Sequence, residues 1–322
     1  MSITFIDLFA GIGGFRIALE KAGAECVFSS EIDKYALQVY KANFNEDASG
    51  DITQIKEEEI PAHDVLCAGF PCQSFSEFGQ RKGFSDPRGT LFFDILRIAK
   101  HHRPKVLLLE NVKGLTYHNG GDTFETIKNT IEDLGYVFSW QLLDATMFGL
   151  PQRRQRVFMV AVRKDIQKSF QFPVGSLTTR TLKDILETNV DANHFLAEQR
   201  WEFICKQKKN GKCEFSYFLM GPDDTAHTLL TSKYEHNLVV DHGQSTGKFH
   251  NVKAKTAKSA RINPQHVRRL TPKEYARLQG FPDSFQMPVS NKQAYRLYGN
   301  AVAVPVVEAI FEEIKKVLWH LR

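Results

Sequence analysis

The chain has 322 residues, 42% of them hydrophobic, which is enough for a sizeable core and predicts one large domain with a smaller one. Its net charge of +5 permits a polyanionic partner without requiring one. The five cysteines are odd in number and none has zinc-site spacing, so we expect no disulfides, no metal and a reducing cytoplasm. The sequence lacks an apolar run near the ~20 residues of a membrane span and a basic signal peptide, which argues against a membrane protein.

A strand, a glycine turn and a helix open the chain. Residues 3–9 form an apolar run, and Gly11 and Gly13 follow before a helical pattern begins. A second short strand, 26–30, ends at Glu31, which lies 20 residues after Gly11. That is the usual gap between a nucleotide-binding glycine turn and the acid that holds a ribose hydroxyl. A tight strand–helix connection without a ligand is the alternative.

Two further residues bear on the type of cofactor. Arg16 stands where the dinucleotide fingerprint has its third glycine, which argues against NAD and favours a nucleoside cofactor without a pyrophosphate. Asp51 follows a predicted helix, 33–44, and could bind an adenine amino group or simply close an Asx turn.

A cysteine and a glutamate follow two apolar runs that are typical of buried parallel strands. Residues 64–68 lead into Gly69-Phe70-Pro71-Cys72, and residues 106–109 lead into Glu110. Ligands of α/β sheets bind beyond the carboxyl ends of the strands, so we expect this thiol and this carboxyl at one rim. The alternative is that Cys72 is a buried structural cysteine, like Cys26 or Cys67.

Cations cluster in two further stretches, one after the first of these strands and one at the start of a later strand. The polar stretch 72–90 carries Arg81, Lys82 and Arg88, and we expect it to be a lid over an anionic ligand before a helix at 90–99. Later, a helix at 122–134 precedes an antiparallel pair at 136–143 and 156–162. Strand alternation places Arg154 and Arg156 on one face, for a shared ligand or as protection of a sheet edge.

The segment 171–265 lacks α/β alternation and has short β-like runs at 215–220, 228–231 and 237–240. Residues 248–269 hold seven lysines and arginines and no acid, which is typical of phosphate contacts or of a solvated face. Order returns with a capped helix at 271–278, a turn at 297–302 and an amphipathic helix at 307–318.

Together, in this order, the motifs resemble the DNA (cytosine-5)-methyltransferases, in particular the short bacterial enzymes of restriction–modification systems. The matching stretches are residues 7–15, 69–76, 110–112, 152–156, 268–282 and 298–302. The resemblance implies an α/β fold with a doubly wound, mostly parallel sheet, as in S-adenosylmethionine-dependent methyltransferases. It implies a catalytic, cofactor-binding domain of residues 1–170 plus 266–322 and a smaller, irregular β-rich target recognition domain of residues 171–265.

The resemblance also implies roles for single residues. Cys72 would be the nucleophile, Glu110 would bind the cytosine ring, and Arg154 and Arg156 would contact the ring carbonyl and phosphates. The S-adenosyl-L-methionine pocket would comprise Phe9, Gly11, Gly13, Glu31, Ile32, Asp51, Pro71, Leu91 and Asn300. Ile32 departs from several relatives, which carry an aromatic residue there. DNA contacts would come from Arg81, Lys82, Arg88, Thr228, Leu229, Lys253, Lys255, Lys258 and Arg261.

The implied activity is sequence-specific methylation of carbon 5 of a flipped-out cytosine in double-stranded DNA, through a covalent cysteine adduct. We expect a cytoplasmic monomer that protects DNA from a partner restriction endonuclease without forming a stable complex with it. Two alternatives stay open: a tRNA substrate, which the basic segment disfavours, and a catalytically silent DNA-binding module or a Rossmann dehydrogenase, which Cys72, Glu110 and Arg16 disfavour.

Overall fold

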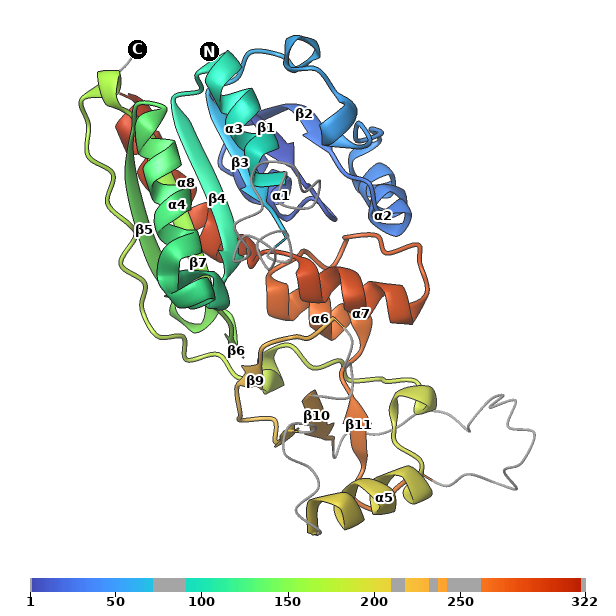
Figure 1. The fold of residues 1–322 in the computed structure, drawn as a ribbon. Helices are drawn as coiled ribbons and strands as arrows, with labels where there is room; N and C mark the ends of the chain where they lie inside the picture. The colour runs from blue at the N-terminus through green and yellow to red at the C-terminus, as the bar shows by residue number, and fades with distance from the viewer. Residues whose placement is uncertain (1, 72–90, 210–217, 232–236, 242–261, 320–322) are drawn as a thin grey trace.

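The computed structural model describes residues 2–71, 91–209, 218–231, 237–241 and 262–319 (Figure 1). Its strands are β1 (Thr4–Leu8), β2 (Glu25–Ser30), β3 (Val65–Gly69), β4 (Val106–Val112), β5 (Tyr136–Asp144), β6 (Gln152–Arg153), β7 (Gln155–Arg163), β8 (Phe218–Met220), β9 (Ala226–His227), β10 (Asn237–Val240) and β11 (Val267–Arg269). Its α-helices are α1 (Gly14–Lys21), α2 (Lys34–Phe44), α3 (Leu91–His102), α4 (Asp122–Asp133), α5 (Glu198–Lys209), α6 (Pro272–Gln279), α7 (Asn291–Asn300) and α8 (Val304–Trp319).

The large sheet has six strands in the order β2-β1-β3-β4-β7-β5. Strands β1 to β4 run parallel, and β7 lies antiparallel between β4 and β5. The predicted antiparallel pair is therefore confirmed, and β7 is an interior strand. Its residues 157–162 are buried, as expected of a strand covered on both faces.

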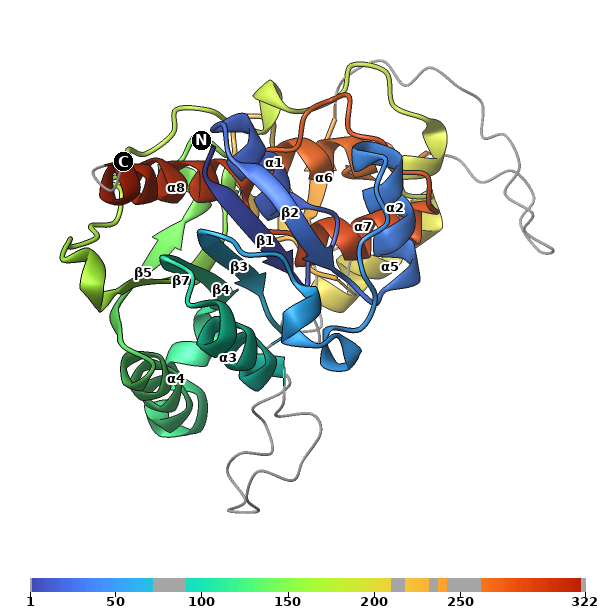
Figure 2. The same ribbon diagram turned by 90° about the horizontal axis from the view of Figure 1, so that it is seen from above.

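Helices cover both faces of this sheet because successive side chains of each strand point to opposite sides. Phe5, Val65 and Leu108 belong to the cluster that packs on α1 and α8, whereas Leu66 and Leu107 pack on α3 and α4. Figure 2 shows the two layers of helices on either side of the strands. Because β1, β3 and β4 are parallel neighbours, their carboxyl ends lie at one rim of the sheet.

Helix α6 begins and ends as its sequence predicts. Thr271 and Glu274 form a reciprocal capping box, and Gly280 adopts a left-handed conformation (φ 80°) directly after the last turn. The predicted turn at 297–302 is wrong in part, because residues up to Asn300 belong to α7. Its buried Ala294, Tyr295, Leu297 and Tyr298 recur at helical spacing, and that packing outweighs the turn preference of the Gly-Asn pair.

The smaller sheet lies beyond α6 and α7 from the large one (Figure 1). In it, β10 pairs with β8 in parallel and with β11 in antiparallel orientation, so its strands extend past residue 265 to Arg269. The strand expected at 228–231 is instead Ala226–His227, which pairs with β6. The run expected at 237–240 forms β10, and the run expected at 215–220 forms β8 in its described part, while 215–217 lie outside the described residues. Within the described ranges, no helix has the length and apolarity to cross a membrane.

Candidate active site

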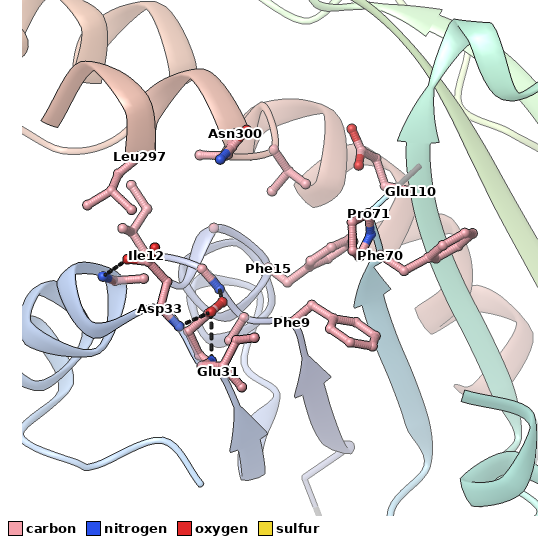
Figure 3. Close-up of a pocket in the computed structure, with 18 of the residues that line it drawn as sticks. Phe9, Ile12, Phe15, Glu31, Asp33, Phe70, Pro71, Glu110, Leu297 and Asn300 are labelled. Atoms are coloured by element: carbon pink, nitrogen blue, oxygen red, sulfur yellow. Dashed lines mark hydrogen bonds between the residues drawn. The ribbon is translucent and has the colours of Figure 1, made fainter. Parts of the chain in front are cut away.

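A cavity of about 610 Å³ opens at the carboxyl ends of β1, β3 and β4. Figure 3 shows its wall, with Glu31 and Glu110 on separate parts of it. All predicted cofactor residues except Gly13 line it, namely Phe9, Gly11, Glu31, Ile32, Asp51, Pro71, Leu91 and Asn300. Glu110, Arg154 and Arg156 line the same cavity, so the structure brings the two predicted groups of residues together.

Glu31 is held at the end of β2 by backbone donors. Its Oε2 accepts a hydrogen bond of 2.7 Å from the N–H of Gly11, and its Oε1 accepts bonds of 2.8 Å from the N–H groups of Ile32 and Asp33. Gly11 has φ 56°, and a Cβ added to it would meet no atom within 4 Å, because that side of the backbone faces open space. The turn thus presents bare backbone and a carboxylate to the cavity.

Gly13 serves packing and not the cavity wall. Its φ is 82°, and a Cβ at this position would lie 2.3 Å from a ring carbon of Phe44 and 3.4 Å from the ring of Tyr40. The glycine is therefore needed for the approach of α2 beneath the turn. The expectation that Gly13 belongs to the cofactor pocket is not matched by this geometry. A glycine pattern alone does not tell whether a glycine makes room for a ligand or for a packed side chain.

Asp51 and Ile32 form another part of the wall. The Asp51 carboxylate accepts hydrogen bonds from the N–H (3.0 Å) and the hydroxyl (2.8 Å) of Thr53, which is the Asx turn expected as an alternative. The residue nevertheless lines the cavity, so turn formation and ligand contact are compatible. Ile32 is 70% exposed and offers an aliphatic surface there.

The tips of β3 and β4 lie side by side. Gly69 is the register partner of Glu110, and a Cβ on Gly69 would lie 3.8 Å from Glu110 Oε2. Asn111 Nδ2 donates a hydrogen bond of 2.9 Å to the carbonyl oxygen of Phe70. Pro71 lines the cavity next to them, and Cys72, which follows it in the sequence, lies outside the described residues.

Glu110 is 8% exposed, and its Oε1 lies 3.3 Å from Arg156 Nε. Burial raises the pKa of this carboxyl, while the positive charges of Arg156 and Arg154 oppose the shift. Desolvation is the larger effect, so Glu110 holds a proton at higher pH than an ordinary glutamate. A carboxyl that can both hold and release a proton suits acid–base chemistry.

Arg154 is almost fully buried and only partly paired. Its Nη2 donates to the carbonyl oxygens of Gly299 (3.1 Å) and Ala301 (2.7 Å). Its Nε and Nη1 are buried and have no hydrogen-bond partner among the described residues. Burial, reinforced by the charge of Arg156, lowers the pKa of Arg154. Buried donors without acceptors are costly, which favours a ligand acceptor at this place.

A family model described as C-5 cytosine-specific DNA methylase matches residues 3–316. The chain belongs to this family. It is accordingly a DNA (cytosine-5-)-methyltransferase, and the α/β architecture, the order of the motifs and the shared cavity agree with that assignment.

Relatives match over nearly the whole chain. The type II methyltransferase M.HhaI of Haemophilus parahaemolyticus is 42% identical over 324 residues, which cover 96% of this chain and 93% of the relative. The type II methyltransferase M.NlaX of Neisseria lactamica is 43% identical over 320 residues, with 97% and 96% covered.

Solved structures share the fold at lower identity. Entamoeba histolytica methyltransferase EhMeth has a TM-score of 0.76 at 20% identity, with 100% of this chain and 99% of that chain covered. S. pombe Dnmt2 methyltransferase has a TM-score of 0.72 at 22% identity, with both chains covered completely. The predicted methyltransferase fold, a mostly parallel sheet with a smaller strand-rich region, is therefore confirmed.

The predicted DNA-contacting residues are only partly described. Thr228 Oγ1 donates to the carbonyl oxygen of Arg153 at 2.7 Å, and Leu229 is buried, so neither side chain projects freely. The predicted cations lie outside the described residues, namely Arg81, Lys82, Arg88, Lys253, Lys255, Lys258 and Arg261.

Several residues of the cavity wall were not predicted. Arg296 of α7 lines it and forms an ion pair of 2.9 Å with Asp33, which also lines it and caps α2. Asn111 and Thr231 also line the cavity. The arginine and the aspartate are 263 positions apart in the chain, so only the fold brings them together.

Proposed function

We propose that this protein transfers a methyl group from S-adenosyl-L-methionine to carbon 5 of a cytosine flipped out of duplex DNA, through a covalent adduct with Cys72. The observation that carries the proposal is the position of Glu110, a buried carboxyl with a raised pKa beside Arg156. It is the register partner of Gly69, at the strand tip that leads to Pro71 and Cys72. One wall then serves the cytosine and the other the methyl donor.

The residues of the cavity fit this cofactor. Bare backbone at Gly11 leaves room for close approach, and the Glu31 carboxylate can accept ribose hydroxyls beside the amides that already orient it. Asp51 offers an acceptor and Ile32 an apolar surface for an adenine ring. When bound, the cofactor supplies an electrophilic sulfonium methyl group.

The chain's own groups account for the activation of the base. Carbon 5 of cytosine is a weak nucleophile, and addition of the Cys72 thiolate to carbon 6 turns the ring into an enamine that attacks through carbon 5. Negative charge developing on the ring is relieved by a proton from Glu110 at N3. Arg156, held 3.3 Å from Glu110, adds electrostatic stabilisation at the ring oxygen. A base, for which a water molecule is suitable, then takes the carbon-5 proton, and the double bond between carbons 5 and 6 re-forms as the thiolate leaves.

DNA would have to be opened for this reaction. A ring face is inaccessible inside a duplex, and extruding the base costs a few kcal/mol. The unpaired Nε and Nη1 of Arg154 would gain acceptors from the extruded nucleotide, which offsets part of that cost. The cations of 72–90 and 248–269 are the proposed phosphate contacts, with Thr228 and Leu229 in the recognition segment. Arg268 is excluded from them because it is fully buried and ion-paired with Asp241 and Glu274.

The biological role proposed here follows from the relatives. Type II methyltransferases are named for their place in restriction–modification, so we place this protein beside an endonuclease that cuts the same DNA word, without a stable complex between them. A cytoplasmic, monomeric enzyme with residues 171–265 as recognition domain completes the proposal.

Bisulfite sequencing of a plasmid incubated with the protein and S-adenosyl-L-methionine tests the activity. We expect protected cytosines within a single recurring word, and none with Cys72→Ala, which should still bind the cofactor. Labelled methyl transfer to duplex DNA and to tRNA, measured side by side, tests the substrate. Transfer to tRNA alone, or normal turnover by Cys72→Ala, would overturn the proposal.

A further inference from the structure

One short segment joins the smaller sheet to the cavity. We define the 226–231 segment as β9 and the residues that follow it. It pairs with β6 through Ala226 and His227, its Leu229 N–H donates to Gln152 Oε1 at 3.2 Å, and its last residue, Thr231, lines the cavity. The residues predicted to recognise DNA thus belong to a stretch that ends at the reaction site.

Two buried glutamines continue this connection. Gln152 and Gln279 are both 0% exposed. Gln152 Nε2 donates to the carbonyl oxygen of Leu278 at 2.8 Å and to Gln279 Oε1 at 3.3 Å. Gln279 Nε2 in turn donates to the carbonyl oxygens of Tyr298 (2.7 Å) and Ala301 (3.2 Å). An unbroken series of hydrogen bonds therefore runs from Leu229 to the end of α7.

The end of α7 belongs to the cofactor wall and touches the 226–231 segment directly. Asn300 and Ala301 line the cavity. A Cβ on Gly299 would lie 3.1 Å from the carbonyl carbon of Leu230 and 3.2 Å from the N–H nitrogen of Thr231, so glycine is what allows the two backbones to approach. Arg154 Nη2 bonds the Gly299 and Ala301 carbonyls from the cytosine side.

These contacts are strong constraints on position. A buried amide whose donors and acceptors are all paired holds both partners, because separating them leaves unpaired polar groups in a low-dielectric interior. Moving the 226–231 segment would break the Gln152 bond, and moving the end of α7 would break those of Gln279. We therefore expect the 226–231 segment and the end of α7 to move, or to stay in place, together.

We propose that Gln152 and Gln279 are positioning residues that tie the 226–231 segment to the end of α7, so that DNA and the cofactor each strengthen the binding of the other. The inference rests on the proposed function, since it assumes that both ligands bind at this cavity. Coupled binding must be reciprocal, and it is measured by one factor, the ratio of cofactor affinities with and without DNA.

The test uses S-adenosylhomocysteine, which cannot react, and a short duplex carrying the word identified by bisulfite sequencing. Dissociation constants for the nucleoside are measured by calorimetry with and without the duplex. The variants are Gln152→Met and Gln279→Met, which keep the volume and remove the hydrogen bonds, with Gln141→Met on the exposed face of β5 as the matched control.

We expect the duplex to tighten nucleoside binding by roughly 5–150-fold in the wild type and in Gln141→Met, the usual range for coupled sites. In Gln152→Met and in Gln279→Met this factor should fall to less than about threefold, while the nucleoside alone still binds. A general loss of stability would not produce this result, because it affects both dissociation constants and cancels in their ratio. A wild-type factor near one, or a factor retained in both variants, would overturn the inference. A wild type that binds neither ligand would instead refute the proposed function.

Discussion

The side-chain amide of Asn111 donates a hydrogen bond of 2.9 Å to the carbonyl oxygen of Phe70, and so joins the tips of β4 and β3. Asn111 is 2% exposed, and its Oδ1 accepts from the N–H of Val112, which orients the amide. The bond fixes the backbone two residues before Cys72 relative to the residue after Glu110. We therefore expect Asn111 to help position the proposed nucleophile, Cys72, relative to Glu110.

Replacing Asn111 by leucine should lower kcat by about 10²-fold, because a misplacement near 1 Å at the reacting atoms has that effect. Cofactor binding should change little, since Gly11 and Glu31 follow other strands, β1 and β2. Steady-state methyl transfer and nucleoside titration separate the two quantities. Asn129→Leu on the exposed surface of α4 is the matched control. An Asn111→Leu variant with wild-type kcat would show that the β3 tip needs no such anchor.

Glu110→Gln should slow methyl transfer by roughly 10²–10⁴-fold, as loss of general acid–base help does. The pKa of Glu110 is raised by burial, so its protonated, proton-donating form is present below that pKa and lost as pH rises through it. The wild-type kcat/KM should therefore decline as pH rises through the pKa of Glu110, which gives an alkaline limb in the pH–rate profile. The variant should lack this limb. A pH–rate profile with the same limb in both proteins would assign the titration to another group.

The buried Arg268 is expected to be critical for stability. Its guanidinium donates to both carboxylate oxygens of Glu274 (2.8 and 2.7 Å) and to Asp241 (2.6 Å), and so joins β11 to the start of α6. Arg268→Met leaves the fully buried Glu274 charge unpaired and should lower the free energy of unfolding by about 3–5 kcal/mol.

The double variant Arg268→Met with Glu274→Gln should recover part of that loss, because the fully buried charge of Glu274 is gone, while that of Asp241 remains. Urea unfolding of the two variants and the wild type measures both effects. A single variant that loses less than about 1 kcal/mol would mean that the charges are better solvated than their burial indicates.

His63 should make folding sensitive to acid. Its ring is 8% exposed and contacts His102, with Nδ1 2.8 Å from the Pro61 carbonyl oxygen, and burial lowers its pKa to about 4 from the ordinary 6.5. Between these values the unfolded chain binds a proton that the folded chain does not. The stability that the neutral His63 contributes is thus fully present above pH 6.5. About 3 kcal/mol of the free energy of unfolding is lost as pH falls to 4.

His63→Phe should remove this dependence, so that the difference in unfolding free energy between wild type and variant changes by about that amount across the same window. Urea unfolding at several pH values measures it. A constant difference would mean that the folded histidine accepts a proton as readily as the unfolded one.

The sequence predicts local features of this fold well and long-range ones poorly. Apolar runs ending in Gly69 and Glu110 predict two parallel strands, and Thr271 with Glu274 predicts a capped helix. In contrast, Gly299 and Asn300 look like turn residues until the packing of Tyr295 and Tyr298 is known. The residues that bond Arg154 lie 145 and 147 positions away, and no local pattern indicates such contacts.

The same division applies to the candidate site. Positions with a family motif, such as Glu31 and Asn300, reach the cavity as expected, because a motif records chemistry that the ligand demands. Gly13 also belongs to a motif, yet it packs against Phe44, because a glycine can be required by the packing of a neighbouring side chain as well as by a ligand. Arg296 lies outside every matching stretch, and the stretches that contain Gln152 and Gln279 give these two residues no role. The contacts of the two glutamines become apparent only where α6, α7 and β6 meet.

The central claim is that Cys72 bonds to the cytosine that receives the methyl group. It is tested most directly by incubating the protein and S-adenosyl-L-methionine with a duplex whose target cytosine carries fluorine at carbon 5. Fluorine cannot leave as the proton does, so the thiolate stays attached to carbon 6. Mass spectrometry of the digested complex should find the nucleotide on the peptide that contains Cys72. A digest without that adduct, from protein that methylates ordinary duplex DNA, would contradict the account.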